Sequence, residues 1–153
     1  MSNNEIDKPW LTPTPDPYAD FDKQSVLILM GQCILGEAEG ESAIAKLAVG
    51  YVIVNRMNGN YWPKDAHKVI LQPRQFQCFD LESSRADIIR EPQRYVEEAI
   101  WNDCFLSAVW ALHGVKPDPT DGANHYHTDN SSPDWSKNKT PNIKIGSHLF
   151  FKL

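Results

Sequence analysis

Positive charge is scarce in this chain. Lysine and arginine together number 15 against 20 aspartate and glutamate residues, so the formal net charge at pH 7 is −5. Proteins that bind nucleic acids normally present a basic surface that neutralises phosphates. The sequence has neither that excess nor a run of basic residues, and we therefore expect no nucleic-acid partner.

Long apolar runs are also absent. No stretch reaches the roughly 20 apolar residues that a membrane-spanning helix needs, so membrane insertion is not expected. The N-terminus has neither the basic start nor the apolar segment of a secretory signal. These absences predict a protein that is made in the cytoplasm and is not exported by the common route.

Cysteine is rare, with three residues and no close pairing. An odd count without a spacing pattern argues against a disulfide framework and predicts reduced thiols. Cys33 and Cys104 lie in apolar segments with helical periodicity, so both are expected in the core. Cys78 has little support as a thiol nucleophile, because no oxyanion-hole motif accompanies it.

The first 22 residues are rich in proline, with Pro9, Pro13, Pro15 and Pro17 among scattered acidic residues. This composition predicts an extended arm at 1–22, which would be a tether, a docking segment or a disordered end. The remaining residues, 23–153, are enough for one domain with a substantial core.

The apolar periodicity of residues 23–153 predicts a mainly helical α+β domain. Helices are expected at 23–38, 41–57 and 65–71, and a third long helix at 92–113 that ends at Gly114. The predicted buried sides are Ile44, Ala48, Tyr51, Val52 and Asn55 on the second helix, and Val96, Ala99, Ile100, Leu106, Val109 and Trp110 on the third long one. A loop is expected between 71 and 92, and short strands at 123–127 and 143–151.

One carboxyl group falls where this periodicity places the core. Val26, Met30, Cys33 and Glu37 follow one another at steps of four, three and four, so they share one face of the first helix. A carboxyl group in apolar surroundings resists ionisation, and its raised pKa lets it hold a proton near neutral pH. Glu37 is therefore a candidate general acid, although most glutamates at helix ends are simply exposed.

Five ordered motifs resemble those of a known family. They are Gly-Glu-Ala-Glu-Gly-Glu at 36–41, Val-Ile-Val-Asn-Arg at 52–56, Gln-Pro-Arg-Gln-Phe at 72–76, Ala-Asn-His-Tyr-His at 123–127 and Ile-Gly-Ser-His-Leu-Phe at 145–150. In this order they resemble the SleB/CwlJ cell wall hydrolases, which are the spore-cortex-lytic enzymes and their bacterial and phage relatives.

The resemblance implies a lysozyme-like domain that cleaves peptidoglycan between N-acetylmuramic acid and N-acetylglucosamine, without a cofactor. It also implies that Glu37 is the catalytic acid, which agrees with the helix-face argument. The sequence departs from the usual pattern at Glu39, where the family generally has arginine, and at Phe150-Phe151, where a tyrosine is common. A negative charge at position 39 would raise the pKa of Glu37 further or weaken substrate contacts.

A hydrolase needs a second carboxylate as nucleophile or base. Glu41, one turn after Glu37, is the nearest candidate for this catalytic role, although a carboxylate stabilised by a helix N-terminus is the simpler interpretation. Without a second carboxylate, the C6 hydroxyl of the sugar attacks and leaves a 1,6-anhydromuramic end, as in lytic transglycosylases. We expect this single-acid mechanism, which several members of the family are thought to use.

A glycan groove needs aromatic rings that stack on sugars and amides that bind hydroxyl and N-acetyl groups. The predicted substrate-binding residues, which lie in or beside the motifs, are Asn55, Trp62, Gln75, Phe76, Tyr126, His127 and Trp135. Asn55 would also serve as a buried structural amide. Arg56 and Arg74 would meet either carboxylates of the peptide stem or buried acids.

Two alternatives stay open. His125 and His127, on one face of a strand, would hold a metal together with His148 or Asp121 in an amidase that cuts the stem peptide. The usual helical histidine motif is absent, so no metal is expected. The other alternative, which Glu39 favours, is a non-catalytic glycan-binding or structural module of a virion or spore coat.

The location follows from the substrate. A protein that acts on the cell wall must reach it by phage delivery, through a holin-type membrane lesion, or by deposition in a spore coat. The proline-rich arm at 1–22 would then dock to a virion or coat protein. A phage endolysin or virion-associated lysin is the first expectation.

Overall fold

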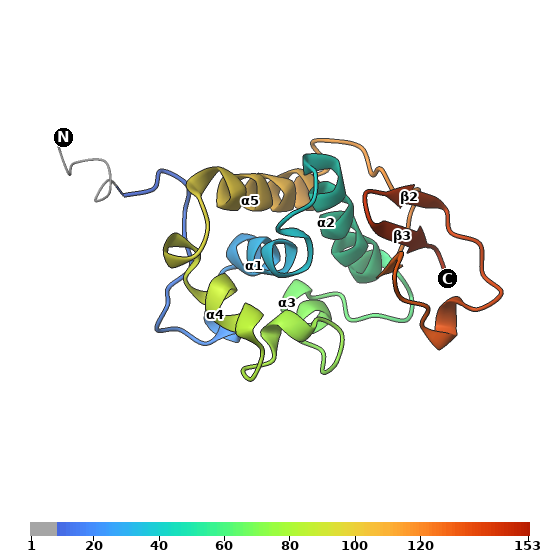
Figure 1. Cartoon of the computed structure of the whole chain (residues 1–153), viewed down its shortest axis with the longest axis horizontal. Helices are drawn as coiled ribbons and strands as arrows, with labels where there is room; N and C mark the ends of the chain where they lie inside the picture. The colour runs from blue at the N-terminus through green and yellow to red at the C-terminus, as the bar shows by residue number, and fades with distance from the viewer. Residues whose placement is uncertain (1–8) are drawn as a thin grey trace.

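A central helix organises the fold. In the computed structural model, which describes residues 9–153, helix α1 (Val26–Ala38) lies in the middle of the other helices (Figure 1). Ser25 caps its N-terminus by accepting a hydrogen bond from the backbone N–H of Ile28 at 3.4 Å. Every residue from Ile28 to Leu35 is buried. The prediction of one buried stripe was therefore too narrow, because a helix enclosed on all sides buries its whole circumference.

Helix α2 (Ala43–Asn58) joins the helical part of the molecule to the sheet. Ser42 caps it by accepting a hydrogen bond from the backbone N–H of Ala45 at 3.3 Å. Ala48 and Val52 face the sheet, in an apolar cluster that includes Phe150. Ile44, which was predicted on the buried side, is 49% exposed, because in the first turn of α2 it is Ala45 and Lys46 that face the interior.

Helix α5 (Glu98–His113) begins six residues later than predicted, because Pro92–Arg94 forms a separate 3₁₀ helix, η4. It ends as predicted at Gly114, whose backbone is left-handed with φ of 63°. The buried side was predicted only in part. Val96, Ile100 and Trp110 are partly buried and pack against the core, but Ala99 is exposed. The fully buried residues are Trp101, Cys104, Ser107, Ala108 and Ala111. Mostly small side chains lie on this face because α5 packs closely on α1 and α2, and the larger predicted residues flank that contact.

The segment between 71 and 92 was predicted to be a loop, but it contains the 3₁₀ helix η3 (Gln77–Phe79) and helix α4 (Ser84–Arg90). Seven residues are too few to show helical periodicity in the sequence, so α4 was missed. Helix α3 (Ala66–Ile70) lies close to its predicted place and is capped by Asp65, whose carboxylate accepts the backbone N–H of Lys68 at 3.1 Å.

Three short strands form an antiparallel sheet beside α2, in the order β1-β3-β2 (Figure 1). Strand β1 (His125–Thr128) pairs with β3 (His148–Phe151), and β2 (Ile143–Ile145) pairs with the other edge of β3. The single strand predicted at 143–151 is a hairpin, because Gly146 turns the chain with φ of 58°. A Cβ atom at this glycine would lie 2.5 Å from a carboxylate oxygen of Glu41.

The described part of the N-terminal arm packs against α5. The indole N–H of Trp101 donates to the carbonyl of Pro13 at 2.8 Å, and the Thr12 hydroxyl donates to the side chain of Asn102 at 2.7 Å. Phe21, in the 3₁₀ helix η2 (Phe21–Lys23), belongs to the main apolar core. The division of the chain at residue 22 stays a prediction, and the first eight residues of the predicted arm lie outside the described residues.

The mainly helical α+β arrangement with a small antiparallel sheet is as predicted. All three cysteines are free and buried, and Cys33 and Cys104 lie in the core as predicted. Within residues 9–153, no helix combines the length and apolar character that crossing a bilayer requires.

Candidate active site

Glu37 lies in the last turn of α1, beside the sheet, and its side chain is partly exposed. Burial raises the pKa of the Glu37 carboxyl. A hydrogen bond with Tyr126 and the charges of Arg85 and Arg56 oppose this shift without cancelling it. The carboxyl therefore stays protonated to a higher pH than an ordinary glutamate, as its place at the end of an apolar helix face predicts.

Two cavities meet at Glu37. The first, of about 390 Å³, is lined among others by Glu37, Glu39, Glu41, Arg85, Ser147 and His148. The second, of about 510 Å³, is lined among others by Glu37, Arg56, Gln75, Phe76, Tyr126, His127 and Trp135. Because Glu37 belongs to both linings, an extended ligand that occupied both cavities would pass over this carboxyl group. We call the two cavities together the Glu37 groove.

Five of the seven predicted substrate-binding residues line the second cavity together with Glu37. They come from two separate segments, the one before η3 and the one from β1 to the 3₁₀ helix η5 (Asp134–Ser136): Gln75, Phe76, Tyr126, His127 and Trp135. The fold thus brings these motifs to one place, although about 50 residues separate them in the chain.

Asn55 has a structural position. Its side-chain amide donates two hydrogen bonds, to the carboxylate of Asp118 and to the carbonyl of Ala123, both at 2.9 Å. Asp118 also accepts hydrogen bonds from Thr120 and Gly122. Asn55 therefore fastens the loop before β1 to α2 and lines neither cavity, which matches the structural alternative given for it above.

Trp62 lies outside the groove lining and supports Arg56. The Arg56 guanidinium is 4.2 Å from the centroid of the Trp62 ring and 5.4 Å from that of Phe76. Its Nε donates to the carbonyl of Asn124 at 2.8 Å, and Nη1 reaches the Gln75 side chain at 3.4 Å. These contacts hold a buried cation in the wall of the second cavity.

Arg85 is a second cation at the site, and the sequence analysis missed it. Its Nη2 donates to the carbonyl of Leu35 at 2.9 Å, and its Nη1 lies 3.5 Å from the carboxylate of Glu39. The charge of Glu39 is therefore paired, and a cation stands beside Glu37 although position 39 lacks the arginine of the family pattern. No sequence signal marked Arg85, because helix α4 that carries it was not recognised.

Replacing Arg85 by glutamine is expected to raise the pKa of Glu37. The guanidinium favours the ionised carboxylate, so its removal leaves the protonated form stable to higher pH. If Glu37 acts as an acid, the alkaline limb of the pH–rate profile for peptidoglycan cleavage should move to higher pH in Arg85→Gln.

Arg90→Gln is the matched control, since Arg90 lies on the same helix and contacts Asp87 and Phe21 instead. Its alkaline limb should coincide with that of the wild type. An Arg85→Gln limb that stays in place or moves to lower pH would contradict the electrostatic role.

Glu41 is engaged by the turn between β2 and β3. The Ser147 hydroxyl donates to its carboxylate, and Nδ1 of His148 lies 3.6 Å from Oε1. Burial lowers the pKa of His148 in spite of the nearby Glu41 charge. Glu41 was predicted to be the first residue of the second helix. It instead precedes Ser42, the N-cap of α2, and so lies just outside the helix. Its contacts fasten the sheet to the helical part, and its catalytic role stays a prediction.

Aromatic rings form the sheet side of the second cavity. The rings of His125 and His127 lie 5.0 and 5.6 Å from that of Trp135, which confirms that both histidines share one face of the strand. His127 also stacks on Phe151 at 5.2 Å. This packing holds the Trp135 ring in the wall of the second cavity.

The two other chemistries receive no structural support. Among residues 9–153, no three histidine, cysteine, aspartate or glutamate side chains are grouped closely enough to hold a metal. Burial raises the pKa of the Cys78 thiol well above its ordinary value, which disfavours the thiolate that a nucleophile needs.

Sequence and structure comparisons agree on the family. A family model described as Cell Wall Hydrolase matches residues 40–151, most of the chain. The chain belongs to the cell wall hydrolase family. This confirms the resemblance that the five motifs carry.

Relatives of this cell wall hydrolase include spore cortex-lytic enzymes from three bacteria. The enzyme of Halalkalibacterium halodurans is 31% identical, over 91% of this chain and 37% of its own length. Those of Oceanobacillus iheyensis and Bacillus cereus are 30% and 29% identical, over 90% and 92% of this chain and 44% and 48% of their own lengths. The chain thus spans less than half the length of these relatives.

Two solved structures have the same fold as this cell wall hydrolase. The catalytic domain of the Bacillus cereus SleB protein superposes with a TM-score of 0.63 at 27% identity, covering 91% of this chain and 95% of that domain. The catalytic domain of a germination-specific lytic transglycosylase, SleB from Bacillus anthracis, gives 0.62 at 27% identity, with 90% and 99% covered. The predicted fold class is thereby confirmed.

Proposed function

We propose that this cell wall hydrolase cleaves peptidoglycan strands between N-acetylmuramic acid and N-acetylglucosamine as a lytic transglycosylase. The observation that carries the proposal is the place of Glu37, a carboxyl of raised pKa where two cavities meet. A glycan strand in the groove would have sugars on both sides of this group, as internal cleavage requires.

Glu37 performs both proton transfers in this mechanism. Its protonated carboxyl donates to the glycosidic oxygen while the bond from C1 of the muramic sugar breaks, and N-acetylglucosamine leaves with a free 4-hydroxyl. The carboxylate then removes the proton from the C6 hydroxyl, whose oxygen bonds to C1. Glu37 ends protonated again, and the new chain end is a 1,6-anhydro sugar.

The surroundings of the other carboxylates favour this single-acid route over hydrolysis. Glu39 and Glu41 also line the first cavity, but Glu39 is paired with Arg85 and Glu41 accepts the Ser147 hydroxyl. Among residues 9–153, no other carboxylate joins Glu37 in the lining of the second cavity. A hydrolase would need one of these groups free to attack or to activate water.

The wall of the second cavity supplies contacts suited to a glycan. Trp135 and Phe76 offer ring faces for the C–H surfaces of sugars, and the Gln75 amide offers polar contact for hydroxyl and N-acetyl groups. Arg56 and Tyr126, close to Glu37, stabilise negative charge on the carboxylate after it has given up its proton.

Mass spectrometry of peptidoglycan digests tests the proposal. Purified vegetative and cortex peptidoglycan digested by the wild-type protein should yield fragments with 1,6-anhydromuramic ends, each one water lighter than the hydrolytic product. Reducing ends would overturn the transglycosylase route and turn attention to Glu41. Glycan that stays intact in both preparations would overturn the enzymatic proposal and favour a binding module.

A further inference from the structure

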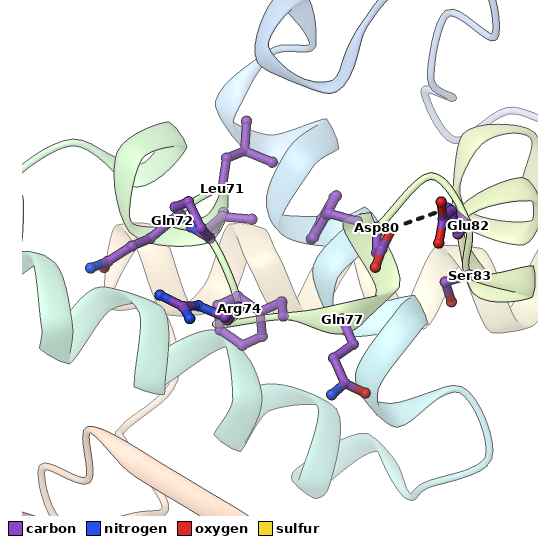
Figure 2. Close-up of a pocket in the computed structure, with 11 residues that line it drawn as sticks. Leu71, Gln72, Arg74, Gln77, Asp80, Glu82 and Ser83 are labelled. Atoms are coloured by element: carbon purple, nitrogen blue, oxygen red, sulfur yellow. Dashed lines mark hydrogen bonds between the residues drawn. The ribbon is translucent and has the colours of Figure 1, made fainter.

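A third cavity adjoins the Glu37 groove. It has a volume of about 530 Å³ and lies in the segment from the end of α3 to the start of α4 (Figure 2). Arg74, Phe76 and Gln77 line both this cavity and the second cavity of the groove. A branch from a ligand in the groove could therefore enter it past these three side chains.

Charges of both signs line the third cavity. In Figure 2, the Arg74 guanidinium lies on one side, next to Gln72, and the carboxylates of Asp80 and Glu82 lie on the other. Within residues 9–153 none of these three charged groups forms an ion pair, and the Arg74 side chain donates no hydrogen bond. The only side-chain hydrogen bond among them is from the backbone N–H of Glu82 to Asp80, at 3.1 Å.

We propose that this cavity binds the stem peptide of the glycan strand. This inference rests on the proposed function, because the stem peptide branches from the lactyl group of the muramic sugar that lies in the groove. Stem peptides carry free carboxylates and, where they contain a diamino acid, a free ammonium group. Arg74 pairs with a stem carboxylate, and Asp80 and Glu82 with the ammonium.

Cleavage rates on matched substrates test this inference. One glycan preparation keeps its stem peptides, and a second has had them removed by an amidase. The wild type should cleave the stem-bearing strands about fivefold faster, which is the size expected of exposed ion pairs. Arg74→Gln and the double variant Asp80→Asn, Glu82→Gln should each lose most of that preference.

Arg94→Gln is the matched control. Arg94 is exposed, pairs with Glu91, and lines none of the three cavities, so its variant should keep the wild-type preference. Equal wild-type rates on the two substrates would overturn the inference. Equal slowing of both substrates by Arg74→Gln would also overturn it, because Arg74 would then serve the groove alone.

Direct binding separates this inference from the proposed function. Calorimetry with a soluble stem tetrapeptide that contains diaminopimelate should detect binding to the wild type and a loss of several-fold in affinity for Arg74→Gln. Binding without any glycan cleavage would overturn the proposed function and keep the stem-peptide site. Absence of binding, with cleavage intact, would overturn the stem-peptide site alone.

Discussion

Replacing Glu37 by glutamine is expected to lower the rate of peptidoglycan cleavage by about 10²- to 10⁴-fold, the usual contribution of a positioned general acid. Glutamine keeps the shape of the side chain but has no proton to give to the glycosidic oxygen. Release of soluble fragments from purified peptidoglycan measures the rate. Anhydro ends should disappear from the Glu37→Gln digest along with the activity.

Glu91→Gln makes the same chemical change at a residue that lines none of the three cavities, and it should retain the wild-type rate. Glu41→Gln distinguishes the single-acid transglycosylase route from hydrolysis with Glu41 as the second carboxylate. In the single-acid route it acts through the packing of the β2–β3 turn and costs much less activity than Glu37→Gln. A Glu37→Gln variant with more than about a tenth of the wild-type rate would contradict the role of this residue.

The stability of Glu37→Gln provides an independent check. In the wild type the folded-state pKa of Glu37 lies above the unfolded value, so the folded state holds more protons between the two. Stability due to this group is therefore present below the unfolded pKa and is lost as pH rises through the folded pKa. Glutamine does not titrate, so the variant does not lose this stability. The melting temperature of the variant minus that of the wild type should therefore increase as the pH rises across this interval.

Replacing Gly36 by alanine is expected to destabilise the fold by about 3 kcal/mol, near the upper end of the usual cost of overpacking. A Cβ atom at this position would lie 2.5 Å from Sγ and 2.6 Å from Cβ of Cys78. Both residues lie in the packed region between α1 and η3, so neither can move without displacing its neighbours. Denaturant unfolding monitored by tryptophan fluorescence measures the loss.

Gly40→Ala is the matched control in the same motif. No atom lies within 4 Å of a Cβ built there, so its stability should stay within about 0.5 kcal/mol of the wild type. Combining Gly36→Ala with Cys78→Gly removes both clashing atoms and should recover part of the loss. A Gly36→Ala protein as stable as Gly40→Ala would show that the clash is relieved at no cost.

The sequence by itself was enough to predict the three long helices and the place of Glu37 beside the core. Gly114 marks a helix end through its backbone freedom, which depends on few neighbours. The apolar steps that end at Glu37 placed its carboxyl beside the core, and the raised pKa agrees with that placement. Motif order was enough to indicate the family.

Tertiary structure alone decided which faces are covered and which distant side chains meet. Periodicity reports the apolar side of one helix, so it did not show that α1 is enclosed all round or that α5 packs through Ala108 and Ala111. Arg85 and Glu37 come together only because α4 packs on α1, a contact that no local pattern encodes. Long-range packing depends on the shapes of both partners, so the sequence did not show that Arg85 lines the groove or that Asn55 and Trp62 lie outside its lining.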